Sequence, residues 1–256
     1  MPYFNYNGYD IFYQEIGQGN PLVLLHGNTA SSKLFEHILD LYKENNRIIL
    51  IDFLGHGKSD RLKAFQTDLW YDEAMQVIEL IEKNRYGKIN LIGTSGGALA
   101  ALNVALERSD LVNKVIADSF EGETAVDSVT QYIQVEREES KSQENGRMFW
   151  EYCHGGDWQS VVDNDTAVVI EHNKTIKNFF HKDLSALSVP SLFTASLEDE
   201  FAKVSGLDFS RLYPTMASKI ANCRVHLFQS GAHPSMLTNA AEFSNIAKAF
   251  FDEDMR

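Results

Sequence analysis

Short, continuous apolar runs recur along the chain and alternate with longer amphipathic segments. Runs of this kind occupy residues 21–25, 47–51, 89–92 and 114–117, and strand character returns at residues 190–195 and 224–228. Uninterrupted apolar runs of this length are typical of strands that a parallel sheet buries on both faces. Residues 68–85 and 240–251 instead repeat apolar side chains at helical spacing. The alternation of strands and helices predicts βαβ units and a mostly parallel sheet, which places the chain in the α/β class.

The N-terminal region adds two features to this alternation. Residues 3–6 and 9–16 are rich in aromatic and β-branched side chains, and an Asn-Gly pair between them is a hairpin turn signal. Ser31 and Ser32 follow the first buried run, and we expect them to cap a helix that extends to Tyr42.

A long polar block interrupts the alternation between residues 121 and 188. It has helical spacing in several places, no clear strand alternation, and many aromatic side chains for a polar stretch. We interpret it as a helical insertion between two strands of one sheet. The predicted organisation is a core domain of residues 1–120 and 189–256, with residues 121–188 inserted into it.

The composition is that of a soluble globular protein. The chain has 256 residues, of which 44% are apolar, and a formal net charge of −13. This charge argues against a nucleic acid or an anionic membrane as partner. No apolar run is long enough to span a bilayer, and the N-terminus lacks the features of a signal peptide. With only Cys153 and Cys223 there is no disulfide framework, so we expect a cytoplasmic monomer or homodimer.

The segment Gly93-Thr94-Ser95-Gly96-Gly97 carries the strongest chemical signal. It follows an apolar strand and leads into a small-residue helix, which is the context that a G-x-S-x-G nucleophile elbow requires. Such a turn strains the serine backbone, and the flanking glycines make room for it. Ser95 is therefore the candidate nucleophile, with the backbone N–H of Gly96 as an oxyanion donor; the alternative is a glycine-rich turn that merely contains a serine.

A serine nucleophile needs a general base and an acid that orients the base. His233 follows the last strand, at the edge where parallel sheets present their functional residues. Asp199 follows the 190–195 strand and is the candidate acid, while Asp118, which follows an earlier strand, is the alternative. His154 and His172, in the insertion, are expected at surface or cap positions.

The segment His26-Gly27-Asn28-Thr29 follows another strand, where a second oxyanion donor is expected. The backbone N–H of Asn28 is the candidate donor, and His26 is interpreted as a residue that supports the loop. The histidines and carboxylates have no compact zinc spacing, and the glycine-rich loops are not phosphate-binding fingerprints. The sequence thus predicts no metal and no cofactor.

Five motifs in consistent order resemble those of the α/β-hydrolase fold superfamily. They are Leu24–Gly27, Ile51–Asp60, Leu91–Gly97, Pro190–Asp199 and Gly231–His233. The resemblance covers nearly the whole chain. It implies a mostly parallel eight-stranded sheet flanked by helices, with a helical cap inserted after the sixth strand. Residues 121–188 resemble this cap, and the motifs carry over the catalytic roles of Ser95, Asp199 and His233.

Two positions depart from the esterase-like members of that superfamily. Thr94 stands where many of them carry histidine, asparagine or glutamine, and Ser196 replaces a more usual glycine before the acid. Asn28 is similar to the halide-binding asparagine of haloalkane dehalogenases, but those enzymes use an aspartate nucleophile, and Ser95 speaks against that chemistry.

The resemblance implies a carboxylesterase-like serine hydrolase. We expect it to cleave an ester, thioester or similarly activated acyl bond of a small to medium, largely apolar small-molecule substrate through an acyl-enzyme on Ser95. The alternatives are C–C bond hydrolysis, lyase or perhydrolase chemistry with the same triad, or a slow, ligand-sensing receptor on the same fold.

Overall fold

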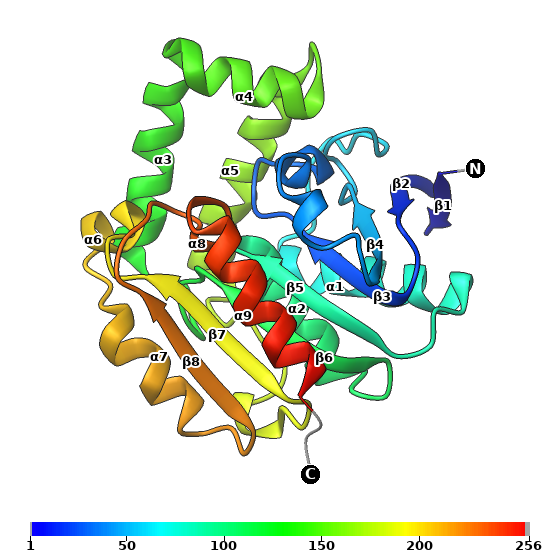
Figure 1. The fold of residues 1–256 in the computed structure, drawn as a ribbon. Coiled ribbons are helices and arrows are strands. Elements are labelled where there is room, and N and C mark those ends of the chain that lie inside the picture. Colours follow the sequence, from blue (N-terminus) through cyan, green and yellow to red (C-terminus); the bar gives the residue numbers. More distant parts are fainter. Residues whose placement is uncertain (1, 254–256) are drawn as a thin grey trace.

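A computed structural model describes residues 2–253 and contains one eight-stranded sheet (Figure 1). Its strands are β1 (Tyr3–Tyr6), β2 (Tyr9–Ile16), β3 (Asn20–Leu25), β4 (Asn46–Ile51), β5 (Ile89–Thr94), β6 (Val112–Asp118), β7 (Ser191–Ser196) and β8 (Cys223–Phe228). They lie in the order β1-β2-β4-β3-β5-β6-β7-β8. The pairs β1–β2 and β2–β4 are antiparallel, and all other neighbours are parallel. The predicted fold class is confirmed.

Helices cover both faces of this sheet. The α-helices are α1 (Leu69–Asn84), α2 (Gly96–Glu107), α3 (Asp127–Ser142), α4 (Glu144–His154), α5 (Trp158–Thr175), α6 (Glu200–Ser205), α7 (Phe209–Ala217), α8 (Ser235–Thr238) and α9 (Ala240–Asp252). Short 3-10 helices span Ser32–Phe35, Leu39–Leu41 and Leu184–Ala186. None of the helices in residues 2–253 has the length and apolar character needed to cross a membrane.

Successive residues of the central strands face opposite sides, and each side has its own apolar core. Leu91 and Val115 belong to a cluster with the buried residues of α1 and α2. Ile92 and Ile116, one position further along, belong to a second cluster with the buried face of α9. This is why the central strands read as continuous apolar runs. In Figure 1, α9 crosses in front of the sheet.

The helices α3, α4 and α5 lie between β6 and β7 in the chain and rise beyond the sheet on one side (Figure 1). They fall inside the polar block 121–188 that the sequence marks as an insertion. Trp150 and Trp158 stack at a centroid distance of 5.5 Å and form a small separate apolar cluster with Val162. The aromatic richness of this block thus has a packing role within the helices themselves.

The single helix expected from Ser31 to Tyr42 is not what the structure contains over that segment. Two short 3-10 helices replace it, and the Ser31 side chain makes no capping hydrogen bond. The backbone N–H of Ser32 donates instead to Asp52 Oδ1 at 2.7 Å, so the loop after β4 holds this segment in place.

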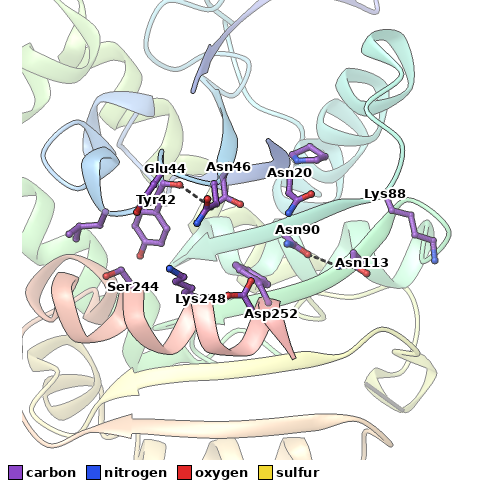
Figure 2. Close-up of a pocket in the computed structure, with 14 residues that line it drawn as sticks. Asn20, Tyr42, Glu44, Asn46, Lys88, Asn90, Asn113, Ser244, Lys248 and Asp252 are labelled. Atoms are coloured by element: carbon purple, nitrogen blue, oxygen red, sulfur yellow. Dashed lines mark hydrogen bonds between the residues drawn. The ribbon is translucent and has the colours of Figure 1, made fainter. Parts of the chain in front are cut away.

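A cavity of about 200 Å³ lies at the amino ends of the strands β3 to β6. Figure 2 labels Asn20, Asn46, Asn90 and Asn113, lining asparagines that come one from each of these strands. Ser95 follows the opposite, carboxyl end of β5. The polar hollow at the amino edge is therefore separated from the candidate nucleophile by the length of the strand.

Candidate active site

Ser95 occupies the sharp turn between β5 and α2. Its backbone has φ 56° and ψ −128°, a conformation that side-chain-bearing residues rarely adopt. The backbone N–H of Ser95 donates to the carbonyl of Asp118 at 2.8 Å, which ties the turn to β6. A Cβ on Gly97 would lie 2.4 Å from the Leu25 carbonyl oxygen, so only glycine allows α2 to start this close to β3. The turn has the geometry expected of a nucleophile elbow.

Three side chains from different strand ends meet in one hydrogen-bonded chain. Ser95 Oγ and His233 Nε2 lie 3.0 Å apart, and His233 Nδ1 lies 2.9 Å from Asp199 Oδ2. Because Nδ1 donates to the carboxylate, Nε2 is left as the acceptor for the serine hydroxyl. The other oxygen of Asp199 accepts from the backbone N–H of Ala202 at 3.0 Å, which caps α6 and fixes the carboxylate.

The surroundings of His233 favour its protonated form. Burial acts against the imidazolium, but the hydrogen bond and negative charge of Asp199, with the charges of Asp118 and Glu200, outweigh it and raise the pKa of His233 above its ordinary value. Glu200 Oε2 also accepts from the backbone N–H of His233 at 3.0 Å. His233 is thus held by two acidic groups, Asp199 at its imidazole and Glu200 at its backbone.

Asp118, the alternative acid, lies in a different network. Its carboxylate is buried and accepts from Thr94 Oγ1 at 2.9 Å, Thr194 Oγ1 at 2.8 Å and the backbone N–H of Met236 at 3.0 Å. The Ser235 hydroxyl also donates to it. Burial raises the pKa of Asp118, although these donors oppose the rise. Asp118 joins β5, β7 and α8, and the structure brings Asp199 rather than Asp118 to His233.

Asn28 lies against the start of α2, but its side chain is already occupied. Its Nδ2 donates to both oxygens of Asp165 at 3.1 Å, and its Oδ1 accepts from Trp70 Nε1 at 3.2 Å. A Cβ on Gly96 would lie only 2.1 Å from Asn28 Oδ1, so the absence of a side chain on Gly96 is what allows this approach. With the amide committed, the backbone N–H groups of Asn28 and Gly96 stay the candidate oxyanion donors.

A cavity of about 440 Å³ opens over Ser95 and His233. Helices α3, α4 and α6 contribute its aromatic wall, which consists of Tyr132, Phe149, Trp150 and Phe201. Its acidic lining residues are Glu136 and Glu200, and no lysine or arginine lines it among the described residues. The space above the nucleophile is therefore apolar and aromatic, with a negative rather than a positive electrostatic character.

The other histidines near the site have structural roles. His26 Nε2 accepts from the backbone N–H of Phe53 at 3.2 Å, and His154 Nδ1 accepts from that of Gly57 at 3.0 Å. Burial, with the nearby His56 as the second cause, lowers the pKa of His26 to about 4 and that of His154 to about 3. Both rings therefore stay neutral and hold loops. His154 and His172, expected at surface or cap positions, are buried.

Cys153, next to His154, carries none of the properties of a reactive thiol. The side chain is buried, and burial raises the pKa of the Cys153 thiol to about 11. A thiol with this pKa is not ionised at neutral pH. Among residues 2–253, no group of three histidine, cysteine or acidic side chains is arranged to hold a metal ion.

Asp165 and Arg137 are two buried charged residues of the inserted helices that no sequence motif singles out. Arg137 Nη1 donates to Asp165 Oδ1 at 2.8 Å. A signal for Asp165 exists, because it occupies the centre of the apolar stripe Val161, Val162, Val168 and Val169 on α5. A charge at such a position has to be paired, which the pattern alone indicates.

Comparison with known proteins assigns the fold family. The sequence profile described as "alpha/beta hydrolase fold" matches residues 20–149, half of the chain. The chain belongs to the alpha/beta hydrolase fold family. Among solved structures, a meta-cleavage product hydrolase from Pseudomonas fluorescens IP01 superimposes with a TM-score of 0.76 at 20% identity. The similarity covers 96% of this chain and 95% of that one, and it shows the same fold.

Two sequence relatives illustrate how this alpha/beta hydrolase relates to named enzymes. It is 35% identical over 104 residues to an (E)-2-((N-methylformamido)methylene)succinate hydrolase from Acinetobacter baylyi, covering 40% of this chain and 38% of that enzyme. It is 24% identical over 255 residues to the serine hydrolase BPHL of Mus musculus, covering 95% of this chain and 84% of that protein. Three relatives, the succinate hydrolase among them, are matched over only 36% to 40% of their length.

Proposed function

We propose that this alpha/beta hydrolase is a serine hydrolase that acts through an acyl-enzyme. His233 takes the proton of the Ser95 hydroxyl as its oxygen attacks the substrate carbonyl, and Asp199 holds the imidazole in the required tautomer. The backbone N–H groups of Asn28 and Gly96 stabilise the oxyanion. After the leaving group departs with a proton from His233, a water that His233 activates releases the acid.

One observation carries the proposal. Ser95 Oγ, His233 and Asp199 are linked by hydrogen bonds of 3.0 Å and 2.9 Å at the floor of an aromatic cavity. A nucleophile bonded to a base, with the base bonded to a buried carboxylate, is the arrangement that activates a serine. Burial of Asp199, which is 1% exposed, keeps water away from that hydrogen bond.

The cavity supports an ester or thioester of a neutral, largely apolar acyl group as substrate. Two relatives are named for acids: the Acinetobacter enzyme as a succinate hydrolase, and one from Metapseudomonas resinovorans as a dienoic acid hydrolase. A substrate carboxylate needs a cationic partner when it is buried. The charged lining of this cavity includes Glu136 and Glu200, which disfavour an anionic substrate.

Hydrolysis of a C–C bond by the same three residues is the second candidate. It is supported by the structural likeness to a meta-cleavage product hydrolase and by a sequence match to a 2-hydroxymuconate semialdehyde hydrolase from Pseudomonas. The acidic lining described above favours the ester reaction over this one, because the dienoic and semialdehyde substrates named for such relatives are acidic or strongly polar.

A labelling experiment combined with a substrate panel tests the proposal. A fluorophosphonate probe is expected to modify Ser95 stoichiometrically, and the wild type is expected to turn over p-nitrophenyl esters and thioesters, with Ser95→Ala as the blank. A label recovered on another residue, or equal turnover by Ser95→Ala, would remove Ser95 as nucleophile. Turnover confined to vinylogous 1,5-diketones, with no ester or thioester hydrolysed, would favour C–C bond hydrolysis instead.

A further inference from the structure

The Asp165 carboxylate is a buried charge outside the Ser95–His233–Asp199 chain, and it accepts hydrogen bonds from several parts of the molecule. It lies in the middle of α5, and its side chain is 0% exposed. Four partners donate to it: Arg137 Nη1 at 2.8 Å, Asn28 Nδ2 at 3.1 Å, His56 Nε2 at 3.1 Å and the backbone N–H of Thr29 at 3.2 Å.

These donors come from parts of the chain that are far apart in sequence. Arg137 belongs to α3, His56 to the loop after β4, and Asn28 with Thr29 to the loop after β3. Asp165 therefore connects the inserted helices to the loop that carries a candidate oxyanion donor. Figure 1 shows α5, the last of the inserted helices, running from α4 toward the sheet.

The charge of Asp165 is maintained by its partners. Burial by itself would raise the pKa of the carboxyl, but the Arg137 guanidinium, with the hydrogen bonds from His56 and Asn28, holds that pKa below its usual range. An ionised carboxylate can accept all four donors at once, whereas an amide in its place has one acceptor oxygen and would turn an NH₂ group toward a donor.

Hydrogen bonds hold the Asn28 side chain from two directions, and this restrains the backbone of Asn28 as well. Asp165 accepts from its amide nitrogen, and Trp70 donates to its amide oxygen. The same carboxylate also accepts from the backbone N–H of Thr29, the next residue. With both Asn28 and Thr29 anchored, the peptide between Gly27 and Asn28 has little freedom to turn its N–H away from the carbonyl of a substrate.

We propose that Asp165 is a positioning residue that holds the Asn28 backbone N–H in the orientation required for oxyanion stabilisation. The inserted helices thus contribute to transition-state stabilisation and not only to the walls of the cavity. This inference rests on the proposed function, since it assumes an oxyanion at Ser95.

The first arm of the test compares two variants on the same helix. Asp165→Asn is expected to lower kcat on a p-nitrophenyl ester by about 10- to 100-fold with KM within about twofold, because a displaced donor is lost only in the transition state. Asp163→Asn is the matched control; that side chain is 58% exposed and pairs with Lys141. It is expected to leave kcat close to the wild-type value.

The second arm reports on the oxyanion site itself. A thionoester replaces the carbonyl oxygen with sulfur, a much weaker acceptor, so its hydrolysis depends less on the N–H donors. Asp165→Asn is expected to slow the ester more than the thionoester, which lowers the ester-to-thionoester ratio. A general loosening of the structure would slow both substrates alike and would overturn the proposal.

A double-mutant cycle shows whether Asp165 acts through Asn28. Asn28→Ala retains the backbone N–H but removes its anchor, and it is expected to reduce kcat and the ester-to-thionoester ratio in the same way. In the Asn28→Ala background, adding Asp165→Asn is expected to lower kcat further by less than about threefold. Fully independent effects would overturn the proposal.

Three further outcomes are decisive. Should Asp165→Asn fail to fold, Asn28→Ala alone decides, and an unchanged kcat and ratio in that variant would overturn the positioning role. Absence of any Ser95-dependent turnover in the wild type would overturn the proposed function and this inference together. Equal kcat for Asp165→Asn and Asp163→Asn, with turnover intact, would overturn only the inference.

Discussion

At the scale of single residues, two buried aspartates at neighbouring strand ends serve different purposes. Asp199 faces His233, whereas Asp118 is saturated by donors from Thr94, Thr194 and Met236. The local sequence of each is compatible with the catalytic acid. Which of them reaches the imidazole depends on the path of the loop after β8, and that path is a tertiary property.

Replacing the two aspartates by asparagine should therefore give opposite results. Asp199→Asn is expected to reduce kcat by about 10⁴-fold with the melting temperature little changed, because the imidazole loses its required tautomer. Asp118→Asn turns an amide toward the donors of Thr94 and Thr194, and is expected to lower the melting temperature while kcat stays within about tenfold. Steady-state kinetics measure kcat, and thermal unfolding measures the melting temperature. The reverse pattern would mean that Asp118, at the end of β6, is the acid that orients His233.

The raised pKa of His233 gives a second prediction. The imidazole acts as a base only when neutral, so kcat/KM is expected to rise with pH through a midpoint above the ordinary histidine value of 6.5. Glu200→Gln removes one of the charges that raise this pKa but keeps a hydrogen-bond acceptor for the His233 N–H, and it is expected to move the midpoint to lower pH. Glu198→Gln, which removes an exposed partner of Lys203, is the control. An unchanged midpoint of the kcat/KM pH profile in Glu200→Gln would contradict the prediction.

At the scale of elements, the sequence predicts what local periodicity determines. The strands and the helices α1, α2 and α9 follow from apolar runs and helical spacing. The elbow at Ser95 follows from the G-x-S-x-G motif, whose glycines make room for the strained turn. The segment from Ser31 to Tyr42 was mispredicted because a contact with Asp52, 20 residues further along, decides its shape. The Asp165 network cannot be predicted from local sequence for the same reason, since its partners lie up to 137 residues away.

The inserted helices give a prediction about acyl chain length. Their aromatic side chains, Tyr132, Phe149 and Trp150, form much of the wall above Ser95. In a p-nitrophenyl ester series from acetate to a medium chain, kcat/KM is expected to rise about fourfold for each added methylene until the cavity is full, which corresponds to about 0.8 kcal/mol per buried methylene. The rates are corrected with Ser95→Ala. A flat series would mean that these aromatic groups pack against one another and offer no acyl site.

At the scale of the whole molecule, the net charge of −13 and the acidic lining of the cavity act in the same direction. Mono-p-nitrophenyl succinate and p-nitrophenyl butyrate have acyl chains of equal length, but only the first carries a carboxylate. We expect a kcat/KM at least tenfold lower for the succinate at low ionic strength, and a rise with added salt for the succinate alone, because salt screens the repulsion. Preference for the succinate would instead align this protein with the relatives named for acidic substrates.

The bond between Asn28 and Asp165 limits how this protein can be re-engineered or diversify. Helices that cover an active site are attractive units for exchange between homologues, because they carry much of the specificity. Here the exchanged unit would take with it the acceptor of the Asn28 amide and leave His56 facing an empty position. A graft of foreign helices would have to bring a carboxylate to the same point and a cation to balance it, so the inserted helices and the loop after β3 have to be exchanged together.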